Sequence, residues 1–323
     1  MVKGHRSRVA ALLLHLVVLP ACAQSYVMHS VPDAPVGGRT AWVELRRAHH
    51  NIFAPCPASR SVSFLGSFAI DLPSLTATFR SGGEDRSGGP TDEEGNAYRG
   101  EPAGEDTSAG SPAGRLVRYD RSGQRTPLGP GPEAGTLGNV SVAVDGGETF
   151  VFFQRRRWQG NGTDSVGRVR VATGEVLHLG MPTDVGPDPE SWVWDYLFPV
   201  DCAGVVLVGR RMSDERGKWH FRTWRGEFGR LTWGPAIEGA FRPIDRQGTL
   251  LEIREDRWLA PPTGLSDFSA EVIRDGRREV VNLGFAGDAD LLFDTGCVVL
   301  WDGESEEVVL RPLFGGAERR FGR

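Results

Sequence analysis

The sequence predicts an all-β protein built from a repeated unit of about fifty residues. A turn with an aspartate and a following glycine, flanked by β-rich segments, recurs at Asp145, Asp201, Asp245 and Asp294. A second hairpin pattern lies between these copies, and no segment is long and periodic enough to indicate a helix. Two alternating hairpins supply four short antiparallel strands in each unit. This pattern is typical of one blade of a β-propeller.

The number of repeats favours a ring of five blades. The four aspartate turns mark four of them, and a degenerate copy near Cys56 marks the first. The last repeat is one strand short, so we expect the N-terminal strand near residues 42–45 to complete it and close the ring. Closure of this kind removes both free sheet edges. A ring of six blades is the alternative.

The N-terminus has the three parts of a secretory signal peptide in residues 1–23. A basic start precedes an apolar core at residues 9–19, which is too short to span a bilayer, and small residues follow it. Residues 19–22 resemble a bacterial lipobox, which implies cleavage before Cys22 and a lipid on its sulfur, although Pro20 departs from the usual pattern. Cleavage before Gln24 would instead give a freely secreted protein. We favour the lipoprotein, anchored in the outer membrane, and expect a location in the periplasm or at the surface of a bacterium.

Two segments are predicted to lie outside the folded body, the first because of its prolines, glycines and polar residues and the second because it has almost no large apolar residue. Residues 24–40 are predicted to form a tether, and residues 80–114, rich in glycine, serine, proline and acids, to form a disordered loop. Apart from this loop, residues 41–323 are expected to fold as one propeller domain. The loop has eight acids and three arginines, which accounts for the net charge of −5 of the whole chain. The remainder is close to neutral, so no nucleic-acid partner is predicted.

One aspartate turn is similar to a known motif. Residues 143–150, Ala-Val-Asp-Gly-Gly-Glu-Thr-Phe, resemble the Asp-box Ser-x-Asp-x-Gly-x-Thr-Trp of sialidase-like propellers, with Ala and Phe in the places of Ser and Trp. The resemblance covers eight residues, and the other three copies keep only the aspartate and the glycine. It implies that Asp145 has a structural role in a turn away from any active site. We predict the same role for the other three aspartates.

Arginines and tryptophans follow the aspartate turns at similar distances, on connections expected at the opposite end of the blades. The candidate ligand-binding residues are Arg155, Arg156, Arg157, Trp158, Arg210, Arg211, Arg254 and Trp258, with Trp192 and Trp194 on the most aromatic connection. Guanidinium groups suit carboxylates, sulfates and phosphates, and tryptophans can stack on sugar rings. The alternative interpretation is structural: the arginines bridge neighbouring blades through nearby acids, and the tryptophans fill gaps between blades. The acids are Asp214, Glu215, Glu255 and Asp256.

No pattern of residues indicates a particular reaction. The histidines are scattered and no Cys-x-x-Cys spacing occurs, so neither a metal nor another cofactor is predicted. Cys202 and Cys297 are expected to be small buried residues and not a disulfide. We therefore expect a binding or scaffolding protein for an anionic glycan, a surface polymer or a protein. A glycan-active enzyme, either a glycoside hydrolase or a lyase, is the alternative, although no motif singles out the two carboxylates that a hydrolase needs.

Overall fold

The computed structural model of the chain is built from β-strands and turns. It describes residues 23–30, 38–51, 61–81, 90–102, 113–134, 136–156, 163–185, 192–212, 218–258, 265–303 and 305–323. Every regular element in these residues is a β-strand, which agrees with the all-β prediction. No helix long and apolar enough to cross a membrane occurs in the described part of the chain.

The strands form six antiparallel sheets, which we number in chain order. The first sheet contains β1 (Ala23–Ser30), β2 (Thr40–Asn51), β3 (Ser61–Asp71) and β4 (Thr76–Ser81). The second contains β5 (Ala97–Pro102), β6 (Ala113–Tyr119) and β7 (Arg125–Ala134). The third contains β8 (Thr136–Asp145), β9 (Glu148–Arg156), β10 (Thr163–Arg170) and β11 (Glu175–Gly180).

The last three sheets follow the same plan with one irregularity. The fourth contains β12 (Val193–Pro199), β13 (Gly204–Met212), β14 (Trp219–Glu227) and the two short strands β15 (Thr232–Trp233) and β16 (Ile237–Glu238), which both pair with β14. The fifth contains β17 (Arg242–Pro243), β18 (Leu250–Trp258), β19 (Ser266–Arg274) and β20 (Arg277–Ala286). The sixth contains β21 (Asp288–Leu292), β22 (Cys297–Asp302), β23 (Glu307–Pro312) and β24 (Arg319–Gly322).

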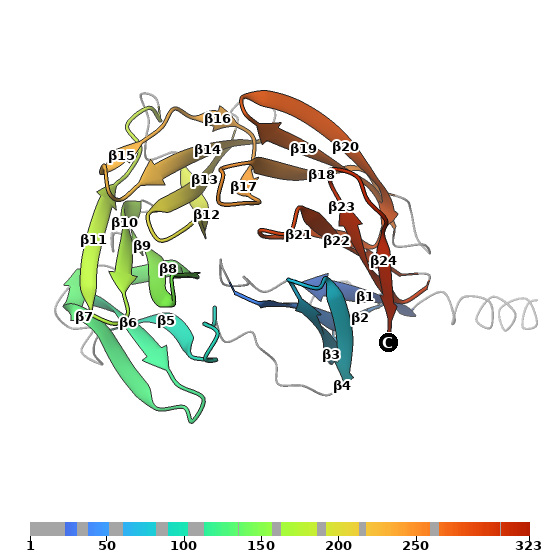
Figure 1. The fold of residues 1–323 in the computed structure, drawn as a ribbon, viewed down its shortest axis with the longest axis horizontal. Coiled ribbons are helices and arrows are strands. Elements are labelled where there is room, and N and C mark those ends of the chain that lie inside the picture. The colour runs from blue at the N-terminus through green and yellow to red at the C-terminus, as the bar shows by residue number, and fades with distance from the viewer. Residues whose placement is uncertain are drawn as a thin grey trace, which may run out of the picture.

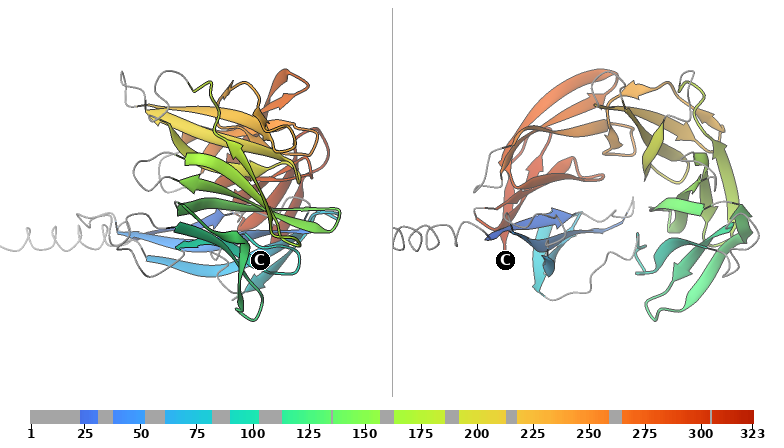
Figure 2. Two further views of the ribbon diagram at one scale, coloured as in Figure 1. Left: turned by 90° about the vertical axis from the view of Figure 1, so that its left-hand side faces the viewer. Right: turned by 180° about the vertical axis from the view of Figure 1, so that it is seen from behind.

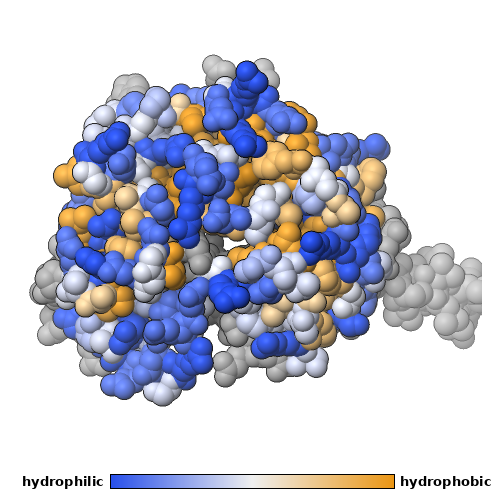
Figure 3. All heavy atoms as spheres, viewed as in Figure 1, coloured by the Kyte–Doolittle hydropathy of each residue, from blue (hydrophilic) through white to orange (hydrophobic). Residues whose placement is uncertain are grey.

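The sheets are arranged around a common centre, as the blades of a β-propeller are (Figure 1). Strands β8, β12, β17 and β21 lie on the inner side of their sheets, and the view from behind in Figure 2 shows the same order. The space-filling view has a small opening near the middle of this face, with polar and apolar residues around it (Figure 3). Each inner strand therefore brings its turn close to the centre of the molecule.

Neighbouring sheets are held together by apolar clusters. In the described residues, such clusters join the second sheet to the third, the third to the fourth, the fourth to the fifth and the fifth to the sixth. A further cluster, which contains Val43, Phe68 and Trp301, joins the sixth sheet to the first. Full burial of one large apolar side chain contributes about 1.5–3 kcal/mol. Packing between sheets is therefore a large part of what stabilises the fold.

The favoured number of units and the predicted closing strand are corrected by the strand pairing. The described residues form six sheets where the sequence favoured five, because residues 97–134 make a sheet whose own aspartate turn, Asp92 to Gly95, lies in the acidic segment predicted to be disordered. Residues 42–45 lie in β2, which pairs with β1 and β3 and not with the sixth sheet. The strand that the last repeat was expected to lack is β24, which is short and basic and therefore gives no β-pattern in the sequence.

Part of the segment predicted to be disordered is ordered. Strand β5 pairs with β6, and the Tyr98 side chain is fully buried. Its hydroxyl donates a hydrogen bond to Asp92 at 2.6 Å, and the Asn96 amide donates to the same carboxylate at 2.9 Å. Burial, followed by the Asp92 hydrogen bond, raises the pKa of Tyr98, so the phenol stays protonated. One buried aromatic residue with a local polar network thus orders a segment of low average hydrophobicity.

The predicted tether is also corrected in part. Residues 23–30 form β1, which pairs along its whole length with β2. The prolines and both glycines of residues 24–40 lie after β1, so the first half of that segment is free to pair as a strand. Cys22 and residues 31–37 lie outside the described residues.

Candidate functional site

The predicted arginines lie at the ends of the second strands, away from the aspartate turns. Arg155 and Arg156 end β9, Arg210 and Arg211 lie near the end of β13, and Arg254 lies within β18. Arg157 and Trp158 fall outside the described residues, and the side chains of Arg156 and Trp258 are likewise not described. We call this end of the sheets the arginine rim.

At the arginine rim, Arg210 and Arg254 have acidic partners within their own sheets. The Nε atom of Arg210 lies 2.8 Å from Asp195 Oδ2, and its guanidinium lies 4.4 Å from the centre of the Trp219 ring. Arg254 pairs with Glu252 at 2.6 Å and also with Glu271 of the adjacent strand. The Glu252 hydrogen bond raises the pKa of Arg254. These contacts give the arginines a structural role, but within single sheets and not as the expected bridges between neighbouring blades.

Trp192 and Trp194, two of the predicted ligand-binding residues, are both buried among other side chains. They are 1% and 5% exposed and pack against Trp224, which is fully buried. The Trp192 indole N–H donates to the Val185 carbonyl at 2.9 Å. The three rings belong to the cluster between the third and fourth sheets, where they pack together with smaller apolar side chains.

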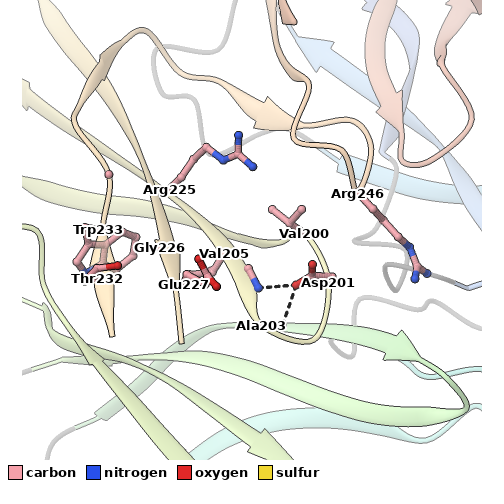
Figure 4. Close-up of a pocket in the computed structure, with 12 residues that line it drawn as sticks. Val200, Asp201, Ala203, Val205, Arg225, Gly226, Glu227, Thr232, Trp233 and Arg246 are labelled. Atoms are coloured by element: carbon pink, nitrogen blue, oxygen red, sulfur yellow. Dashed lines mark hydrogen bonds between the residues drawn. The ribbon is translucent and has the colours of Figure 1, made fainter. Parts of the chain in front are cut away.

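A pocket of about 400 Å³ lies at the opposite end of the fourth sheet, beside the aspartate turns (Figure 4). Its walls come from the β12–β13 turn, the β14–β15 hairpin and the β17–β18 turn. The polar and aromatic residues that line it are Asp201, Arg225, Glu227, Thr232, Trp233 and Arg246. We call it the turn pocket.

The turn pocket lies where the outer strand of the fourth sheet is interrupted. Strand β15 pairs with Gly226 and Glu227 of β14, whereas β16 pairs further back along the same strand. Pro235 lies between them and has no backbone N–H for a ladder bond. The N–H of Ala236 instead donates to Asp184 at 3.0 Å. The interruption is therefore fixed by specific contacts, and it gives the pocket an irregular wall.

Arg225 is the cation of the turn pocket that lacks an acidic partner in the described part of the chain. Its Nη1 donates to the Gly248 carbonyl at 3.1 Å. Gly248 has φ of +90°, and a Cβ atom there would lie 2.2 Å from Nη2 of Arg225. Glycine is thus required both for this turn conformation and for the approach of the guanidinium. The exposed Arg225 is held in place at one nitrogen, and its other N–H donors remain available to a ligand.

The other pocket residues are also positioned by their surroundings. Oδ1 of Asp201 accepts hydrogen bonds from the N–H groups of Ala203, at 2.7 Å, and Gly204. The Trp233 indole N–H donates to the Gly180 carbonyl, and its ring packs on Gly226, where a Cβ atom would lie 2.8 Å from a ring carbon. A flat aromatic wall and a fixed carboxylate therefore border the same cavity.

Arg246 connects the pocket to the centre of the molecule. Its Nη1 lies 3.3 Å from Asp145 Oδ1, and its Nε lies 3.4 Å from Asp294 Oδ2. The aspartate turns of the third, fifth and sixth sheets thus meet at one side chain. Near them, burial and a hydrogen bond with Asp145 raise the pKa of the Cys202 thiol to about 11. Cys202 and Cys297 are both free thiols, as predicted.

The sequence interpretation missed Arg225, Trp233 and Arg246. A signal for the first two was present: Gly234 and Pro235 interrupt a strand that is continuous in the corresponding hairpins of the third and fifth sheets. Arg246 follows an aspartate that was assigned a turn role, and nothing in the sequence indicates that it contacts other sheets. No group of three or more potential metal ligands occurs in the residues that the structure describes.

The chain matches no protein-family model, and no curated protein matches it. Solved structures match it only weakly and at low identity. The Nup133 β-propeller domain of Vanderwaltozyma polyspora is 9% identical over 88% of this chain and 97% of that chain, with a TM-score of 0.34. The WD40 domain of SCAP from fission yeast is 11% identical over 90% and 74%, with a TM-score of 0.29. An endo-arabinase from Bacteroides thetaiotaomicron is 14% identical over 76% and 89%, with a TM-score of 0.30. Scores of this size assign the chain to none of these families.

Proposed function

We propose that this chain is an exported β-propeller of the bacterial cell envelope that binds a glycan in the turn pocket. The observation that carries the proposal is the combination of Trp233, fixed flat on the pocket wall, with Asp201, Glu227 and Thr232 around the same cavity. A sugar ring has an apolar face that stacks on an indole, and hydroxyls that bond to carboxylates. A cavity of about 400 Å³ is within the size range of small-ligand sites.

We take the six sheets as six blades of the propeller. Apolar packing between the first and sixth sheets supports a ring closed by side chains, without exchange of a strand. A bond from the Arg319 guanidinium to the Ser74 carbonyl joins the same two sheets. Closure of this kind leaves each sheet with its own strands.

Export and a lipid anchor at Cys22 remain part of the proposal, supported by the signal-peptide pattern of residues 1–23. Labelling of producing cells with palmitate tests the anchor, with Cys22→Ser as the control. Loss of label in the variant would support it. A mature N-terminus at Gln24 would instead mean free secretion.

Titration calorimetry of the mature chain against neutral and acidic oligosaccharides tests the binding site. We expect Trp233→Leu to weaken binding about tenfold or more, because stacking on an aromatic wall is lost while apolar packing is kept. Trp219→Leu, at the arginine rim, is the control and should leave affinity unchanged. Equal affinity for both variants would contradict the proposed site.

The same oligosaccharides can distinguish a binding protein from an enzyme. Asp201 and Glu227 both line the turn pocket, which is the observation that keeps a glycan-active enzyme as the second candidate. Chromatography of the oligosaccharides after long incubation reads turnover directly. Intact ligand supports a binding protein, and shortened products would support the enzyme.

A further inference from the structure

We infer that the sugar held in the turn pocket carries a single carboxylate, as a uronic acid does, and that Arg225 binds this carboxylate. The inference rests on the proposed function and specifies its ligand class. It begins from the charges that line the pocket, because two arginines and two acids face the same cavity.

Three of these four charged groups have partners or bonds of their own. Arg246 lies between Asp145 and Asp294, Glu227 lies 3.4 Å from Arg230, and Oδ1 of Asp201 is bonded to the amides of its own turn. Of the two arginines, Arg225 is the one without a carboxylate partner among the described residues, because its side-chain hydrogen bond goes to an uncharged carbonyl. A bound anion would supply the charge that this guanidinium lacks among the described residues.

The geometry at Arg225 suits a planar anion. A guanidinium has five N–H donors in a fixed plane, and a carboxylate can accept two of them side by side. The bond from Nη1 to Gly248 fixes the orientation of the group before a ligand arrives. Pre-orientation of this kind lowers the entropy cost of binding, so the guanidinium acts as a specificity element and not only as a source of charge.

The carboxylates in the pocket disfavour anions of higher charge. Asp201 and Glu227 line the cavity that the ligand enters, so a phosphate dianion or a densely sulfated chain would meet two like charges. The same carboxylates can accept hydrogen bonds from sugar hydroxyls. A ligand with one negative charge and several hydroxyls satisfies both conditions, and a uronic acid has this composition.

Matched ligands test the inference. Galacturonate, glucuronate and mannuronate, each as a single sugar, are titrated into the mature chain beside their methyl esters, which keep the shape and remove the charge. We expect at least one acid to bind about tenfold or more tighter than its ester, the size of one charge-assisted contact. A sulfated galactan should bind more weakly than that acid.

Arg225→Gln should reduce the preference for acid over ester to less than about threefold, while the ester itself still binds. Arg277→Gln, at an exposed arginine of the fifth sheet, should leave the preference unchanged. Equal binding of acid and ester by the unaltered protein would overturn the inference and leave the proposed glycan site standing. Failure of every sugar to bind would overturn both the inference and the proposed function. An unchanged preference for acid over ester in Arg225→Gln would overturn the inference alone.

Discussion

The two ends of the fourth sheet use the same residue types in different ways. At the arginine rim, Arg210 lies against Asp195 and over the Trp219 ring, and Trp192 is buried among other aromatic rings. At the turn pocket, Arg225 has no acidic partner in the described residues, and Trp233 lines a cavity. An arginine is therefore a candidate ligand residue where it has no acidic partner, and a tryptophan where its ring lines a cavity.

The two ends of the fourth sheet differ because the arginine rim follows the repeat and the turn pocket departs from it. Residues that recur in register along the chain meet similar surroundings in each sheet, and Arg210 and Arg254 both find carboxylates within their own sheets. The turn pocket lies where the repeat fails, at the break between β15 and β16. In a repeated fold, a departure from the repeat is thus a better indication of a specific site than the repeated residue itself.

The largest loss of stability should come from replacing Trp192, in the cluster between the third and fourth sheets. Trp192→Ala should lower the free energy of unfolding by about 3–5 kcal/mol, because it leaves a cavity between the third and fourth sheets. Trp219→Ala, at a side chain that is 41% exposed, should cost less than about 1 kcal/mol. Denaturant unfolding measures both. A stable Trp192→Ala protein with impaired sugar binding would return the ligand site to the rim.

A glycine pair should separate backbone strain from ligand binding. Gly248→Ala and Gly276→Ala each place a side chain at positive φ, which costs about 1–2 kcal/mol. At Gly276 the new Cβ meets nothing within 4 Å, whereas at Gly248 it displaces the Arg225 guanidinium. Both variants should lose stability, and Gly248→Ala alone should lose the preference for acidic sugars. Retention of that preference would mean that Gly248 does not position Arg225.

A smaller effect is expected where Arg246 joins the aspartate turns. The side chain is 34% exposed and its ion pairs are longer than 3 Å, so Arg246→Met should cost less than about 1 kcal/mol. Added salt should reduce the difference in stability between Arg246→Met and the unaltered protein, because salt screens partly exposed ion pairs. Thermal unfolding at low and high ionic strength measures this. A larger loss that does not depend on salt would indicate a packing role.

The smallest expected effect is on the reactivity of the Cys202 thiol, which lies beside Asp145. A pKa of about 11 for Cys202 leaves less than about 0.1% thiolate at pH 8, whereas an ordinary thiol is about one quarter ionised there. Alkylation of Cys202 by iodoacetamide should therefore be slow in the folded protein. Asp145→Asn removes the neighbouring negative charge, so the thiol pKa should fall and the rate should rise. Mass spectrometry of the labelled peptide reads the rate, and an unchanged rate would argue against the Asp145 contact.

Much of the strand pattern was readable from the residues. The aspartate turns fall between the first and second strands of four consecutive sheets, where glycine and aspartate suit tight turns. The second sheet was misjudged, because Tyr98 and Asp92 order it through one buried contact and not through a hydrophobic run. β1 and β24 were missed for a related reason, since pairing with a neighbour orders a short strand whose own sequence is weakly β-forming.

The sequence by itself determined the all-β class, the hairpin repeat and the turn positions, because alternation and turn chemistry are local properties of the chain. Only the tertiary structure decided which arginines and tryptophans are satisfied. Arg225 and Gly248 belong to different sheets, and Arg246 reaches turns about a hundred and about fifty residues away along the chain. Contacts of this range depend on how the sheets pack around the centre, and no local pattern encodes them.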